Sequence, residues 1–151
     1  MQINLKMAKR IDEIQSQAVK VMLPAELLSI VEQGFEIRQN CALLVAQIPG
    51  GSNASLKDFP DRTGYECFIN SFHIDDYVDG NFVEVAYAFA KALLNLWRQS
   101  QYFEVGQVIV AETEFGSIVK FHLLRAGESW LDDDLETYDV GILVLDSSCA
   151  I

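Results

Sequence analysis

The chain has 151 residues, half of them hydrophobic, and a formal net charge of −11. This length and hydrophobic content predict a single folded domain over residues 1–151 and exclude an intrinsically disordered chain. No apolar run approaches the roughly 18 residues of a membrane-spanning helix, and the first twenty residues carry charges throughout, unlike a secretory signal, so we expect a cytoplasmic protein.

The negative charge is concentrated toward the end of the chain. Residues 1–40 carry five basic and five acidic side chains, whereas residues 104–151 carry two basic and ten acidic ones. Such a surface repels phosphates, so the charge argues against nucleic acid as a direct ligand and favours a basic protein partner. The alternative is that the acidity serves only solubility.

The three cysteines are Cys41, Cys67 and Cys149. Their odd number and the absence of a C-x-x-C spacing argue against a disulfide framework and against a thiolate zinc site. We expect buried or terminal free thiols.

The first part of the chain predicts a pair of helices. Apolar residues repeat at helical spacing over residues 5–22, and a second helix over residues 24–33 begins at Pro24 and is closed by Gly34. The apolar run 41–48 then predicts a strand, with a buried helical turn as the alternative. Residues 50–64 are rich in Gly, Ser, Asn and Asp and predict a long loop.

Residues 65–74, YECFINSFHI, are rich in aromatic and β-branched residues and predict a strand with Phe68 and Phe72 as core anchors. Three aspartates follow it at positions 75, 76 and 79, and Gly80 completes the approach to the next helix. Carboxylates at a helix N-terminus are stabilised by the helix dipole, which partly explains these residues without a ligand.

The longest predicted helix covers residues 81–99 and organises the fold. Its apolar side chains recur at i, i+3, i+4 and i+7, leaving so narrow a polar strip that the helix must lie against a large apolar surface. Asn81 is the predicted N-cap, with Glu84 as its capping partner. The apolar side chains are Phe82, Val85, Ala86, Phe89, Leu93, Leu96 and Trp97.

The remaining apolar runs predict strands. Residues 106–113 and 117–125 form a hairpin in which Lys120 and His122 share one face, and residues 140–146, apolar on both faces, form an internal strand. The predicted fold is therefore α+β: a mainly antiparallel sheet of about five strands, an N-terminal helix pair and one long central helix packed on the sheet.

Candidate catalytic or metal-binding side chains are few. The only histidines are His73 and His122, which could combine with Asp75 or Asp76 if their strands were neighbours. No spacing requires such a site and no catalytic motif is present, so we expect no metal, no cofactor and no enzymatic activity. The alternative is a small acid–base enzyme built on His73, Asp75 and His122, which would need both histidines in one deep pocket.

The stretch 126–139 holds six carboxylates and no Lys or Arg. Aromatic anchors surrounded by carboxylates are typical of an interface with a basic partner. The alternative is a connection that buries Trp130 and Leu135 and leaves its charges in water. The residues predicted to bind the partner are Glu128, Trp130, Asp132, Asp133, Asp134, Glu136, Tyr138 and Asp139, together with Asp75, Asp76 and Asp79.

The strand YECFINSFHIDDY, the long helix after it and the segment ESWLDDDLETYD give the chain a resemblance to the immunity proteins of bacterial toxin systems, in particular those of contact-dependent growth inhibition. The resemblance implies stoichiometric inhibition of one cognate toxin, often a nuclease with a basic active-site cleft. An adaptor or chaperone-like module with an apolar groove beside residues 81–99 is the second interpretation.

Overall fold

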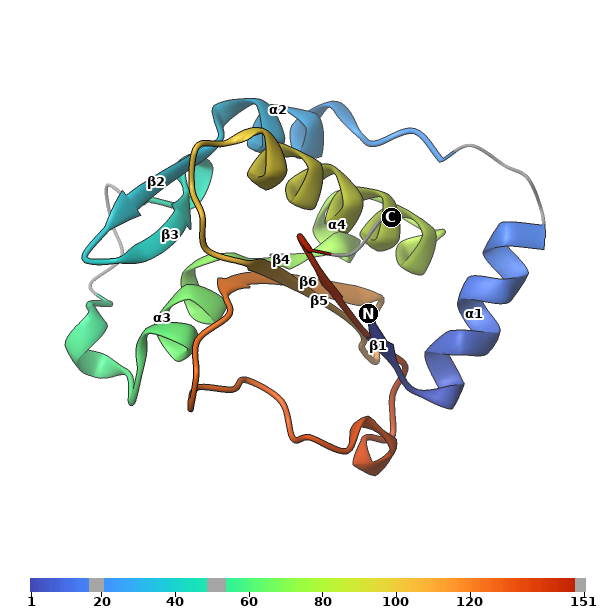
Figure 1. Cartoon of the computed structure of the whole chain (residues 1–151). Coiled ribbons are helices and arrows are strands. Elements are labelled where there is room, and N and C mark those ends of the chain that lie inside the picture. Colours follow the sequence, from blue (N-terminus) through green and yellow to red (C-terminus); the bar gives the residue numbers. More distant parts are fainter. Residues whose placement is uncertain (17–20, 49–53, 149–151) are drawn as a thin grey trace.

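The computed structural model describes residues 1–16, 21–48 and 54–148 (Figure 1). The helices are α1 (Leu5–Ser16), α2 (Ala25–Gln33), α3 (Arg62–Ile69) and α4 (Phe82–Gln99). The strands are β1 (Gln2–Ile3), β2 (Phe35–Arg38), β3 (Cys41–Leu44), β4 (Ser71–His73), β5 (Gly106–Glu112), β6 (Ser117–Leu123) and β7 (Ile142–Asp146). Short 3₁₀ turns occupy Val45–Gln47, Leu56–Asp58, Ile74–Asp76 and Leu135–Thr137.

The main sheet has five strands in the order β1-β7-β5-β6-β4, and every pairing is antiparallel. The predicted α+β fold is confirmed, as are the β5–β6 hairpin and the internal position of β7. The assignment of two strands to the main sheet differs from the prediction. The two-residue strand β1 supplies an edge that the sequence pattern did not indicate, and the run after Cys41 pairs in a separate two-stranded sheet with β2.

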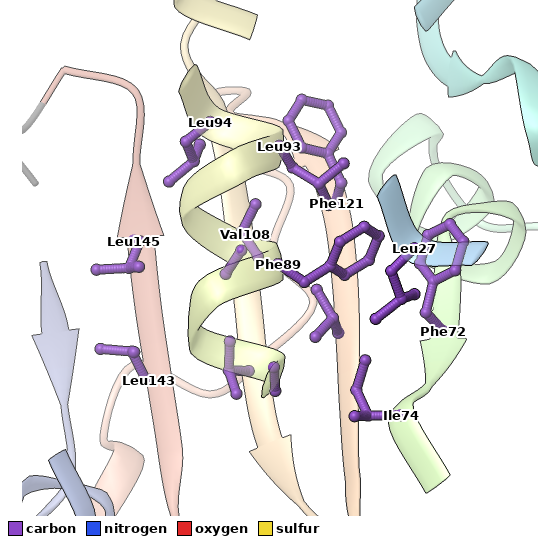
Figure 2. Packing of buried hydrophobic residues seen from close by; sticks show 14 of the residues in the cluster. Leu27, Phe72, Ile74, Phe89, Leu93, Leu94, Val108, Phe121, Leu143 and Leu145 are labelled. Carbon is purple, nitrogen blue, oxygen red and sulfur yellow. The ribbon is translucent and has the colours of Figure 1, made fainter. Parts of the chain in front are cut away.

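Helix α4 lies across the sheet, as its apolar stripe predicts (Figure 1). Figure 2 shows Phe89, Leu93 and Leu94 pointing from α4 toward strands β5, β6 and β7. The predicted cap is wrong: Asn81 has φ 53° and its side chain makes no capping hydrogen bond, although its carbonyl oxygen accepts one from the Val85 amide at 2.9 Å. A capping residue normally has extended backbone geometry, which turns its side chain toward the first helical amides.

The two N-terminal helices cover the same face of the sheet as α4. Met7 and Ile11 of α1, and Leu27 and Ile30 of α2, belong to the same buried cluster as the α4 side chains. Helix α2 ends at Gly34 with φ 78°, as predicted, whereas Pro24 is its N-cap and not its first helical residue. Helix α1 is shorter than predicted: its last described residue is Ser16, residues 17–20 lie outside the described part, and residues 21–24 are not helical.

The prediction of a strand over residues 65–74 is wrong for most of its length. Residues Arg62–Ile69 form α3, capped by Asp61, whose carboxylate accepts a hydrogen bond from the Gly64 amide at 2.7 Å. Phe72 of β4 is buried as predicted, but Phe68 is 54% exposed. The strand interpretation failed because it took Phe68 as inward-facing, whereas the buried positions Thr63, Glu66, Cys67 and Asn70 follow helical spacing.

The β2–β3 hairpin turns at Gln39 and Asn40, which both have positive φ as this turn requires. The strand predicted over residues 41–48 is confirmed for its first half, β3, which runs directly into the 3₁₀ turn Val45–Gln47; this turn has no buried residue, unlike the buried helical turn that was the alternative. The predicted loop 50–64 ends earlier than expected because α3 begins at Arg62. Its residues 50–53 lie outside the described part, and the 3₁₀ turn after Ser55 has a capping box closed by Asp58.

The opposite face of the main sheet, turned away from α4, is covered by the segment between β6 and β7, drawn in orange in Figure 1. This face carries its own buried cluster of Ile109, Ile142 and Val144, onto which Leu135 packs from that segment. Alternation along β5 and β7 therefore supplies two apolar faces, and the acidic stretch of the chain provides the cover for the second one.

Candidate functional site

The acidic segment, residues 126–139, is an ordered cover of the sheet. Its Leu135 is buried, and the Leu135 carbonyl oxygen accepts a hydrogen bond from Nδ2 of the buried Asn4 at 3.2 Å. The same Asn4 amide donates to the Val140 carbonyl oxygen at 2.8 Å. The segment is thus a fixed scaffold for its carboxylates, and Leu135 is tucked into the core as the structural alternative expected.

Glu128 has a structural role. Its Oε2 atom accepts hydrogen bonds from the amide and the hydroxyl of Thr63, at 3.0 and 2.9 Å, in the first turn of α3. Burial opposes the charged form, but the bonds from Thr63 and the positive charges of Arg125 and Arg62 prevail and hold the pKa of Glu128 below its ordinary value. This predicted partner-binding residue is therefore committed to α3, where a carboxylate also matches the helix dipole.

Three further carboxylates of the acidic segment also have structural partners. Glu136 Oε1 accepts a hydrogen bond from the first amide of α1, at Leu5, at 2.8 Å. Asp134 caps the 3₁₀ turn by accepting from the Glu136 amide at 3.0 Å, and Asp139 forms an exposed ion pair with Lys6 at 3.8 Å.

The aromatic residues of the acidic segment differ in exposure. Tyr138 packs against the second core cluster, and its hydroxyl accepts a hydrogen bond from the Asp132 amide at 2.9 Å. Trp130 is 42% exposed, and Lys120 Nζ lies 5.0 Å from the centre of its ring. The same ammonium group donates to the Cys67 carbonyl oxygen at 3.0 Å and contacts Ser71 Oγ at 2.9 Å, so the cation is already engaged.

Asp132 and Asp133 are the carboxylates of the acidic segment that have no structural partner among the described residues. Both side chains are exposed, and neither carboxylate has a hydrogen-bond or ion-pair partner among the described residues. Both line a cavity of about 310 Å³ between the acidic segment and the sheet. Trp130 and Leu131 form other parts of its wall, so the unpaired carboxylates stand beside apolar surface.

His122 lies in the wall of that cavity and is 2% exposed. Its Nδ1 atom is 3.0 Å from the Leu123 carbonyl oxygen, which makes Nδ1 the protonated nitrogen and leaves Nε2 as an acceptor. Nε2 is buried and has no hydrogen-bond partner in the part of the chain that the structure describes. Burial lowers the pKa of His122, so the ring is neutral at pH 7.

The other predicted binding residues lie elsewhere. Asp75 is next to Gly116 of the β5–β6 turn, where a β-carbon on that glycine would come within 3.0 Å of the aspartate side chain. Asp76 and Asp79 are exposed on the connection between β4 and α4. No hydrogen bond or ion pair among the described residues joins this turn to the acidic segment, so the predicted site divides into two separate patches.

The two histidines do not converge, although their strands are neighbours. His73 is exposed and pairs with Ile118, four residues from His122 along β6, a separation of roughly 13 Å at about 3.3 Å per residue. His73 does not line the cavity that contains His122. Among the described residues, no three His, Cys, Asp or Glu side chains are placed to hold a metal ion. Cys41 and Cys67 are buried free thiols as predicted, and Cys149 lies outside the described residues.

Sequence reasoning missed the cavity as a place where His122 and the acidic segment meet. The available signal was the alternation along β6, which places Lys120 and His122 on the face opposite the main core. It also missed the buried ion pair between Glu66 and Arg125, which are 59 residues apart, so that no local pattern of the sequence indicates it.

None of the helices in the described part of the chain is long and apolar enough to cross a membrane. In comparisons with known proteins, a family model described as "Uncharacterized protein PM0498 family" matches residues 2–151. The uncharacterized protein PM0498 of Pasteurella multocida (strain Pm70) is 33% identical over 78 residues, which cover 48% of this chain and 49% of the relative. The chain thus spans about half the length of the curated relative it matches. No solved structure matches the chain.

Proposed function

The chain belongs to the uncharacterized protein PM0498 family, and we propose that it is a binding protein for a basic protein partner, which it contacts through the acidic segment. The observation that carries this proposal is the pair of unused carboxylates, Asp132 and Asp133, held beside the exposed Trp130 on an ordered scaffold. An aromatic anchor next to unpaired charge is typical of an interface centre.

We infer further that the partner is a cognate bacterial toxin and that the chain acts as its immunity protein in the cytoplasm. The net charge of −11 and the concentration of carboxylates after residue 104 support this inference. A toxin nuclease needs a basic cleft to hold phosphate, and a rigid acidic surface can block that cleft or a site beside it. Long-range attraction would also speed the encounter, so the inhibition needs no chemistry from this chain and no cofactor.

The test begins with the gene next to the one that encodes this chain. We expect it to encode a larger protein whose C-terminal domain is toxic when expressed alone and harmless when co-expressed with this chain. The two should co-purify as a stoichiometric complex. A harmless C-terminal domain, or one that stays toxic in the presence of this chain, would contradict the immunity role.

The contact surface is tested by paired variants of equal charge change. Asp132→Asn with Asp133→Asn should slow association with the partner. The association rate of the parent protein should fall as salt rises, because the screening length is already about 8 Å at 0.15 M. Glu26→Gln with Glu32→Gln, which alters exposed positions of α2, is the matched control and should have a much smaller effect. Asp134 is left intact because it caps a turn.

The second acidic patch has its own variant, Asp76→Asn with Asp79→Asn. If this pair slowed association and the Asp132 and Asp133 pair did not, the partner would bind at the β4–α4 turn instead. Stopped-flow measurements at low and high salt distinguish the two surfaces.

A second candidate function is an adaptor or chaperone-like module. The observation that favours it is an apolar groove of about 270 Å³ beside α4, formed by Phe35, Leu96 and Tyr102 with neighbouring residues, next to the fully exposed Phe103. Binding through this groove would depend little on salt and would be weakened in a Leu96→Ser variant, since Leu96 lines the groove. A partner whose association does not depend on salt but requires Leu96 would therefore support the adaptor over the acidic interface.

A further inference from the structure

The cavity beneath the acidic segment, hereafter the His122 cavity, has an acceptor and negative charge but no cation of its own. No Lys or Arg is among its lining residues. Two basic side chains that adjoin the lining residues Trp130 and Glu128 have other partners, because Lys120 is bound at Cys67 and Ser71 and Arg125 is bound to Glu66. The carboxylates of Asp132 and Asp133 are therefore not neutralised by the described part of this chain.

The unpartnered Nε2 of His122 is a separate observation that points to a ligand. A buried acceptor without a hydrogen bond is costly, and such atoms in folded proteins normally have a partner. Since Nδ1 donates to the Leu123 carbonyl, Nε2 can only accept, so the missing partner must be an N–H or O–H donor.

The wall of the cavity is mixed, and its apolar part suits a ligand with an apolar stem. The apolar part comes from Ile109 and Val144 of the sheet and from Leu124, Trp130 and Leu131, and the polar part from Gln2, Gln107, Ser129 and the acidic side chains. The volume of about 310 Å³ lies at the lower end of the range for small-molecule pockets and suits one long side chain.

We propose that the His122 cavity receives an arginine side chain of the partner protein, with its stem along the apolar walls and its guanidinium group shared between His122 Nε2 and the carboxylates of Asp132 and Asp133. This inference rests on the proposed function and names the anchor of that interface. Arginine fits better than lysine because its planar guanidinium carries five donors that can reach an imidazole and a carboxylate together, and it also stacks on an aromatic ring.

The test uses Nα-acetyl-arginine amide as the probe and Nα-acetyl-citrulline amide as its uncharged analogue of similar shape. Two-dimensional NMR of the indole N–H groups reports the site directly. Trp130 lines the cavity, whereas Trp97 is buried in the main core with its indole donating to the Glu104 carbonyl, so Trp97 is an internal control. We expect a saturable shift of the Trp130 signal in the millimolar range with arginine, no shift of Trp97, and no saturation with citrulline.

Variants then locate the contacts. Asp132→Asn with Asp133→Asn should weaken the probe at least about fivefold, a change at the upper end for exposed ion pairs, while Glu26→Gln with Glu32→Gln should leave its affinity unchanged. His122→Phe, which keeps a ring but removes the acceptor, should also weaken it, provided that the Trp97 signal shows an intact core. If His122→Phe does not fold, the variant with Asp132→Asn and Asp133→Asn still tests the proposal.

Three results would overturn the proposal: no saturable Trp130 shift, equal affinity for citrulline or for the corresponding lysine amide, or an equal loss in the α2 control variant. These results are distinguishable from failure of the proposed function. A toxin that still binds this chain while the arginine probe does not would disprove the anchor alone, whereas probe binding without any neighbouring toxin would disprove the immunity role alone.

Discussion

Glu66 of α3 and Arg125, just beyond β6, form a two-bond ion pair in the interior, with Nη1 to Oε2 at 2.7 Å and Nη2 to Oε1 at 2.9 Å. Glu66 is 0% exposed, and its carboxylate also accepts from the amides of Ala42 on β3 and Leu123 on β6. Asn70 bridges the same strands, accepting from the Leu44 amide and donating to two carbonyl oxygens. Two polar side chains of one segment thus join the β2–β3 hairpin to strand β6 of the main sheet.

Removing one member of this pair should destabilise the fold strongly. We expect Glu66→Ala to cost about 3–5 kcal/mol, because Arg125 would lose the carboxylate that it is bonded to twice and the amides of Ala42 and Leu123 would lose their acceptor. The measurement is urea-induced unfolding. Glu36→Ala is the matched control, since Glu36 is bonded to Arg38 at the same 2.7 Å but is exposed; its unfolding midpoint should stay near that of the parent. Equal effects of the two substitutions would contradict the role given to Glu66.

The core beneath α4 should be equally sensitive to truncation. Phe89 is fully buried and lies edge-on to Phe72, so Phe89→Ala should cost about 3–5 kcal/mol, as large core truncations do. Phe103→Ala removes the same ring from a fully exposed position and should change stability little. An unchanged unfolding midpoint for Phe89→Ala would mean that α4 does not pack on the sheet as described.

The stability of the protein should fall as pH falls below about 6.5 because His122 is buried in its neutral form. Burial lowers the pKa of His122, with a contribution from Arg125, whereas the bond to the Leu123 carbonyl and the carboxylates of Glu66 and Asp61 oppose that shift. Between the lowered folded-state pKa and the ordinary value near 6.5, the unfolded chain binds the additional proton, so acid favours unfolding.

The measurement is the free energy of unfolding between pH 7.5 and 5. A His122→Asn variant should show a flatter pH dependence over this range than the parent. His73→Asn is the control, because it makes the same substitution at an exposed position. If the parent were as stable at pH 5.5 as at pH 7.5, the buried neutral ring would be contradicted.

Chelation should leave the protein unaffected. We expect the thermal unfolding midpoint, and binding to the partner, to survive exhaustive treatment with EDTA followed by dialysis. The described residues place no three potential ligands together, and His73 and His122 are separated along neighbouring strands. A midpoint that dropped after chelation and recovered on adding zinc or magnesium would revive a metal site.

The local patterns of the sequence determined the elements whose burial follows one period. Helix α4 and the β5–β6 hairpin were predictable because their apolar residues repeat at a spacing near 3.6 or 2, and β7 because its apolar run is continuous; each pattern depends only on neighbours along the chain. The same reasoning mistook α3 for a strand. Its inward face includes Glu66, and a carboxylate becomes a core residue only when a distant partner, here Arg125, neutralises it.

The candidate site shows the same division. Composition alone indicated an acidic surface near the end of the chain. It could not show which carboxylates have structural partners, because those partners are remote in sequence. Glu128 is bound by Thr63, 65 residues away, and Glu136 by Leu5, 131 residues away. Tertiary structure alone decided that Asp132 and Asp133 are unused and that they meet His122 at one cavity, since only the folded chain brings the acidic segment onto that face of the sheet.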